Sequence, residues 1–163
     1  MPIEVEPITG SAGAGVCGVD LADVSIGPAE ELRKVWLDHK ALVVHDQSIS
    51  RTAPVGFGRR FGDLEVHPFT ERDSEHPETG QRGIFTNRSF VSHIEGVDRN
   101  ESDEIIGHLE RQIMSPSGQC RIRWLKDTLV MWDNRAVQHA ATNDVLPEHR
   151  RMERVIIVGD RPC

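Results

Sequence analysis

The sequence contains few cysteines and no long apolar run. Cys17, Cys120 and Cys163 are far apart and form no C-x-x-C pair, so neither a disulfide framework nor a thiolate zinc site is indicated. No segment approaches the roughly 18 consecutive apolar residues that a membrane-spanning helix needs. The first ten residues, MPIEVEPITG, are acidic, whereas a secretory signal starts basic and becomes apolar. We therefore expect a cytoplasmic protein in a reducing compartment, with no membrane partner.

Positive charge is also in short supply. The chain has 26 acidic residues against 19 Lys and Arg, which gives a net charge of -7. The basic residues are interleaved with acids and form no stripe, so nucleic acid is not an expected partner. With 163 residues, 37% of them hydrophobic, the chain has the size of one domain. We expect a single domain over residues 1–163.

Apolar periodicity predicts a mixed, β-rich fold with a few helices. Alternating residues among glycines predict short strands near the amino terminus. Leu32, Val35 and Trp36, behind a Ser25 cap, predict a helix, and residues 100–114 predict another that starts at Asn100. A short helix is expected to end at Gly62. Further strands are predicted in ALVVHD (41–46), QCRIRWL (119–125), TLVMWD (128–133) and RVIIVGD (154–160), and a strand followed by a turn is predicted in GIFTNRSF (83–90).

Residues 66–83 interrupt this order. The stretch VHPFTERDSEHPETGQRG is polar, has two His-Pro dipeptides and shows no apolar period, so it is predicted to be loop. A compact domain rarely needs so long a structureless connection. The region marks a natural division between an amino-terminal part, 1–72, and a carboxyl-terminal part, 73–163.

The carboxyl-terminal part carries candidate chemistry. In a strand, Arg150 and Arg154 share one face. Two guanidinium groups on one face favour a bound anion, although neutralisation by Asp144 or Glu148 on a solvated face is equally compatible with the spacing. His139 precedes them. A lone histidine is more often a structural residue than a metal ligand, and nothing here has zinc spacing.

Several segments resemble one family, the taurine dioxygenase family of iron(II)- and 2-oxoglutarate-dependent dioxygenases. The clearest is WDNRAVQHAATNDVLPEHRRMERVIIVGDRP, residues 132–162. Others, in the family's order, are PITGSAGAGVCGVDLADVS, HKALVVHDQSIS, RRFGDLEVHP, HPETGQRGIFTNRSF, ESDEIIGHLERQI and RIRWLKDTLVMWDNR. Together they cover nearly the whole chain.

The resemblance implies a fold and a set of site residues. The fold is a double-stranded β-helix, or jelly roll, with flanking helices. His139 matches the distal histidine ligand of iron, and Arg150 matches the arginine that pairs with 2-oxoglutarate. Arg154 matches an arginine that meets the substrate's anionic group. His67 and Phe90 match residues that line the substrate pocket. The implied cofactors are Fe(II) and 2-oxoglutarate, and the implied substrate is a small organic acid.

One part of the family pattern is missing. These enzymes hold iron with two histidines and one carboxylate, and the family's H-x-D stretch, which belongs between residues 70 and 74, is absent. Three H-x-E pairs exist, at His76, His93 and His108, but roughly one is expected by chance for this composition. The implied jelly roll is therefore incomplete, and its open strand edges would need covering, for example by a second copy.

Three interpretations remain. The first is a dioxygenase that hydroxylates a small organic acid and releases succinate and CO2. The second is a catalytically inactive remnant, which keeps the arginine face as an anion-binding or assembly surface. The third is that the natural polypeptide carries an internal segment that this sequence lacks, which would restore the first.

Overall fold

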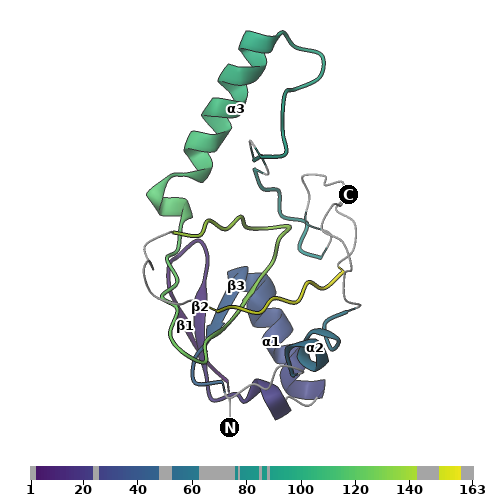
Figure 1. The fold of residues 1–163 in the computed structure, drawn as a ribbon, viewed down its shortest axis with the longest axis vertical. Coiled ribbons are helices and arrows are strands. Elements are labelled where there is room, and N and C mark those ends of the chain that lie inside the picture. The colour runs from purple at the N-terminus through teal and green to yellow at the C-terminus, as the bar shows by residue number, and fades with distance from the viewer. Residues whose placement is uncertain are drawn as a thin grey trace.

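A four-stranded mixed sheet forms the centre of the fold (Figure 1). The computed structural model describes residues 3–23, 26–47, 53–62, 76, 78–84, 86–87, 89–142 and 151–158. Strand β1 (Glu4–Pro7) pairs antiparallel with β2 (Ala14–Cys17), β2 pairs parallel with β3 (Ala41–Val44), and β3 pairs antiparallel with β4 (Leu129–Trp132). The sheet therefore joins the amino-terminal and carboxyl-terminal parts of the chain, because β4 follows β3 by more than eighty residues and lies beside it.

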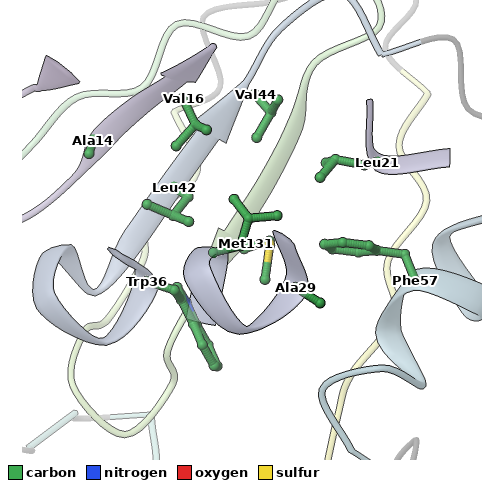
Figure 2. Close-up of a cluster of buried hydrophobic side chains, with 10 residues drawn as sticks. Ala14, Val16, Leu21, Ala29, Trp36, Leu42, Val44, Phe57 and Met131 are labelled. Atoms are coloured by element: carbon green, nitrogen blue, oxygen red, sulfur yellow. The ribbon is translucent and has the colours of Figure 1, made fainter. Parts of the chain in front are cut away.

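Helix α1 (Ile26–His39) covers one face of this sheet (Figure 2). Leu32 is fully buried and Trp36 is 9% exposed, as their helical spacing predicts. Helix α2 (Ala53–Gly58) adds Phe57, whose ring centroid lies 5.0 Å from that of Phe61. The buried cluster consists of Ala14, Val16, Leu21, Ala29, Leu32, Trp36, Leu42, Val44, Phe57 and Met131.

Helix α3 (Arg99–Ile113) extends away from the sheet (Figure 1). Its cap is Asp98, whose carboxylate accepts hydrogen bonds from the backbone N–H groups of Asn100 and Glu101. The prediction of Asn100 as the cap was wrong by two residues, because the side chain that meets the free N–H groups is that of Asp98. Only Ser102 and Ile106 of this helix are buried, so it contributes little to the core.

The remaining elements are short. Two 3-10 helices lie at η1 (Leu21–Asp23) and η2 (Pro116–Gly118). Within the described ranges, no helix is long and apolar enough to cross a lipid bilayer.

The predicted strands that have a neighbouring strand in the sheet are confirmed, and the others are not. The predicted strands at 41–46 and 128–133 are confirmed as β3 and β4. Residues 119–125 are irregular although Cys120 and Ile122 are less exposed than Arg121 and Arg123, so the predicted strand is wrong. Likewise, the described parts of 83–90 and 154–160 form no strand, and Ile157 is an isolated bridge residue. Side-chain alternation alone does not make a strand, which needs a neighbour to receive its hydrogen bonds. The described residues thus form one open sheet and no closed jelly roll.

Candidate functional site

Asp133 is the first residue after β4 and the centre of a polar cluster. Its side chain is only 3% exposed. Its backbone N–H donates to Lys40 O at 2.9 Å, which extends the β3–β4 pairing by one residue. Its backbone carbonyl accepts from the N–H groups of Ala136 and Val137, which closes a tight turn. Asp133 is therefore fixed by the sheet on one side and starts a turn on the other.

Asp133, two arginines, a second carboxylate and a histidine form a charge network, which we define as Arg33, His76, Glu78, Asp133 and Arg135; His76 and Asp133 are its buried members. Arg135 donates to Asp133 through its backbone N–H at 2.8 Å, Nε at 3.0 Å and Nη2 at 2.9 Å. The same Nη2 donates to Glu78 Oε1 at 2.9 Å. Glu78 also accepts from Arg33 Nη2, on α1, at 2.7 Å. The network connects α1, the turn at 76–80 and the end of β4.

His76 is held in one tautomer. Its Nδ1 lies 3.2 Å from the backbone nitrogens of both Glu78 and Thr79. A backbone N–H can only donate, so Nδ1 must be the unprotonated acceptor. The proton is then on Nε2, which donates to Asp133 Oδ2 at 2.8 Å. His76 is thus a neutral imidazole with both ring nitrogens satisfied inside the protein.

The network shifts the acidity of its members. Burial acts to raise the pKa of Asp133, but hydrogen bonds from Arg135 and His76 outweigh it, so this pKa lies below its ordinary value. For Glu78 the same balance, between burial and the two arginines, also lowers the pKa. Burial opposes the charge of Arg135, yet its carboxylate partners raise the pKa of this guanidinium further. Both carboxylates are therefore ionised at neutral pH.

His139 follows this turn closely and is exposed. Its ring centroid lies 4.8 Å from that of Trp132, the last residue of β4, with an angle of 52° between the planes. The preceding residue, Gln138, donates to Thr86 O at 2.9 Å and accepts from Asn87 Nδ2 at 3.4 Å. The segment is thus held by Gln138 directly before the predicted iron ligand.

The structure describes three of the five predicted site residues. His139 lies at the end of the sheet as above. Phe90 is 74% exposed in a turn, so its ring does not line an enclosed pocket, and its place beside a substrate stays a prediction. Arg154 is exposed in the irregular segment 151–158. Arg150 and His67 lie outside the described residues, as do Asp144, Glu148 and the Ser25 cap.

The described donors do not fit an iron site. Over the ranges that the structure describes, no three His, Cys, Asp or Glu side chains lie close enough together to hold a metal ion. The H-x-E pair at His76 cannot supply ligands, because His76 uses both nitrogens within the protein and Glu78 is paired with two arginines. His93 is exposed, and its Nδ1 lies 2.9 Å from Ser92 Oγ. One histidine is all that the described residues offer from the family's ligand set.

The sequence patterns do not predict the charge network. Residues 66–83 have the composition of a loop, and the His76–Glu78 spacing alone does not exceed what chance predicts. The sequence feature that indicates a charged cluster is the run Asp133-Asn134-Arg135, which directly follows a buried strand. An acid and an arginine at the end of such a strand need oppositely charged or hydrogen-bonding partners. The sequence of residues 76–80 does not indicate that Asp133 is the hydrogen-bond partner of His76.

The fold is that of a dioxygenase known from crystal structures. A taurine dioxygenase from Burkholderia xenovorans superimposes with a TM-score of 0.86 over 98% of this chain and 92% of that one, at 18% sequence identity. Residues 4–80 and 74–156 match the sequence profile of the family described as taurine catabolism dioxygenase TauD, TfdA family. The chain therefore belongs to the TauD/TfdA family, which confirms the resemblance read from the sequence.

Curated relatives match the chain at higher identity, but the matches cover only part of each relative. An alpha-ketoglutarate-dependent sulfonate dioxygenase of Saccharomyces cerevisiae is 32% identical over 109 residues, covering 66% of this chain and 26% of that protein. An alkylsulfatase of Acinetobacter baylyi is 31% identical over 85 residues, covering 52% of this chain and 26% of that protein. The matches thus span about a quarter of the length of these relatives. The two segments that match the family overlap at residues 74–80, which include His76 and Glu78.

Proposed function

We propose that the chain serves a 2-oxoglutarate- and iron(II)-dependent dioxygenase reaction that hydroxylates a small organic acid and releases succinate and CO2. The observation that carries this proposal is the family membership over residues 4–156. The names of the relatives, a sulfonate dioxygenase and a sulfate ester dioxygenase of Pseudomonas putida among them, support a sulfonate or sulfate ester as the substrate class. Molecular oxygen would be the oxidant, taking two electrons from the decarboxylation of 2-oxoglutarate and two from the substrate C–H bond, and iron would activate it when bound.

The chain's own residues would bind and orient the organic acids. An arginine fork pairs with a carboxylate through two parallel hydrogen bonds, which suits Arg150 to the distal carboxylate of 2-oxoglutarate. Arg154 would meet the anionic group of the substrate, and its exposure leaves the guanidinium accessible. His139 would be one iron ligand, with its ring set against Trp132. His67 and Phe90 would line the substrate pocket.

A second function is favoured by the incomplete donor set. If the chain supplies only His139, it binds iron weakly, because the facial site of this class needs two more ligands. The protein would then be a non-catalytic module that binds dicarboxylates through Arg150 and Arg154. The complete double-stranded β-helix would in that case also be missing, and β1, an exposed edge of the sheet, could pair with a second copy in a homodimer.

Anaerobic titration with Fe(II), with and without 2-oxoglutarate, separates the two functions. A chelated keto-acid gives a weak visible charge-transfer band, and the dioxygenase proposal requires this band in the natural protein and its loss in His139→Ala. The matched control is His93→Ala, which removes another exposed histidine and should keep the band. If a folded sample gives no band, the dioxygenase proposal fails for this chain. Calorimetric binding of 2-oxoglutarate without iron, abolished by Arg150→Ala and kept by Arg121→Ala, would then support the binding module.

A further inference from the structure

We propose that His76 is a positioning residue: as a neutral hydrogen-bond donor it holds Asp133, and through the turn at 133–137 it sets the place of the segment that carries His139. The relevance of this to chemistry rests on the proposed function, in which His139 is an iron ligand. The positioning itself is a property of the chain's own contacts.

Charge balance supports a neutral His76. The network contains two guanidinium groups, on Arg33 and Arg135, and two carboxylates, on Glu78 and Asp133. These four charges cancel without the histidine. A proton on Nδ1 would add an uncompensated charge to a side chain that is only 6% exposed, and burying an unpaired charge is costly. The same proton would face the two backbone N–H groups that now donate to Nδ1.

The hydrogen bond from His76 to Asp133 connects the turn at 76–80 to the segment that carries His139. The carboxylate of Asp133 is held at Oδ2 by His76 and by Arg135. Its backbone carbonyl closes the turn through Val137 N at 2.9 Å. The chain then reaches Gln138, which is bonded to residues 86 and 87, and next His139 on the Trp132 ring. His76 therefore joins the turn at 76–80 directly to Asp133, beside the second connection that Glu78 makes to Arg135.

Other roles for His76 do not fit. A metal ligand needs a free nitrogen lone pair, and a general base needs one that substrate can reach. Nδ1 is occupied by two backbone donors, Nε2 is bonded to Asp133, and the ring is buried. The arrangement leaves His76 a role in placing other groups and none in contacting substrate.

The test uses two variants that each keep half of the imidazole's bonding. His76→Gln can place an amide N–H where Nε2 donates to Asp133, but it loses the acceptor in the turn. His76→Asn keeps an acceptor near Nδ1, but it is too short to reach Asp133. His93→Asn is the matched control at an exposed histidine. The probe is the cross-relaxation signal between the Trp132 and His139 rings in NMR spectra of the metal-free protein.

We expect the ring signal to be lost in His76→Asn and retained in His76→Gln and His93→Asn. Signals between the paired residues Val43 and Val130 should persist in all of them, which shows that the sheet is intact. A long-range nitrogen–proton spectrum of the natural protein should show the Nε2–H tautomer at His76. An Nδ1–H tautomer, or an unchanged ring signal in a folded His76→Asn, overturns the proposal. Because no iron is used, a missing charge-transfer band would reject the proposed function and leave this result standing.

Discussion

Gly13 occupies a position where the backbone and the neighbouring side chains both require glycine. Its φ is +84°, and an added Cβ would lie 2.9 Å from Cys120 Sγ and 3.3 Å from Ile8 Cδ1. Its N–H donates to His39 O, and its carbonyl accepts from Ile8 N, so the turn between β1 and β2 cannot easily shift. The crowding comes from residue 120, far along the chain, and a local sequence pattern does not reveal it.

Substituting Gly13 should therefore destabilise the protein. The left-handed backbone costs a side chain about 1–2 kcal/mol, and overpacking adds about 1–3 kcal/mol. We expect Gly13→Ala to lower the free energy of unfolding by at least about 2 kcal/mol in urea titrations, in line with these ranges. Gly10→Ala is the control, because nothing lies within 4 Å of its added Cβ. Equal losses in the two variants would show that the crowding at Gly13 is relieved at no cost.

The same neighbour predicts an order of thiol reactivity. Burial raises the pKa of the Cys120 thiol, whereas Cys17 is exposed. The thiolate is the nucleophile, so a raised pKa and limited access both slow alkylation. At pH 8, iodoacetamide should modify Cys17 before Cys120, as peptide mass spectrometry of timed samples can measure. Faster modification of Cys120 would mean that residues 119–125 open away from Gly13 in solution.

At the scale of elements, helix α3 depends more on its own cap than on packing. Since only Ser102 and Ile106 are buried, the carboxylate of Asp98 is the main contact that fixes where the helix begins. We expect Asp98→Ala to destabilise the helix by about 1 kcal/mol and to speed amide hydrogen exchange at Asn100 and Glu101. Asn100→Ala should change little. The reverse ranking would restore Asn100 as the cap.

Local sequence patterns predict the helices and strands that depend only on their own residues and on burial against a core. The stripe of Leu32 and Trp36 predicted α1, and the apolar run at 41–44 predicted β3, because each pattern needs only the element's own residues and a generic core. Residues 119–125 have a strand's alternation but lack a ladder in the described structure, and the need for a partner strand is not visible in their own sequence. Of the candidate site, family resemblance predicts His139, whereas no local pattern predicts the role of His76, because its partner Asp133 is 57 residues away.

At the scale of the whole molecule, the charge network joins segments that lie far apart in the sequence. It connects Arg33 on α1, Glu78 in the turn at 76–80, and Asp133 at the end of β4. The sheet already links the amino-terminal and carboxyl-terminal parts of the chain through β3 and β4, and the network adds a second link where the two family-matched segments meet. Loss of Asp133 should leave the largely buried Arg135 without one of its charged partners, which costs more than the lost contact.

The network should also give the protein a characteristic loss of stability in acid. The folded-state pKa values of Asp133 and Glu78 lie below their ordinary values of 3.8 and 4.5. Between the folded and ordinary values the unfolded chain binds protons that the folded chain does not, so the free energy of unfolding rises with pH there. The stabilisation is fully present above about pH 5 and is lost as pH falls through the folded pKa values.

Asp133→Asn should remove much of this dependence. We expect a loss of about 3 kcal/mol at pH 7, because an arginine and a histidine lose a buried charged partner, and a shallower decline in stability below about pH 4.5. The control is Asp103→Asn, which breaks the exposed Arg99–Asp103 pair and should cost less than about 0.5 kcal/mol with the acid slope unchanged. Urea titrations at several pH values give both quantities. If Asp133→Asn kept the natural slope, the acid sensitivity would arise outside the Asp133 carboxylate.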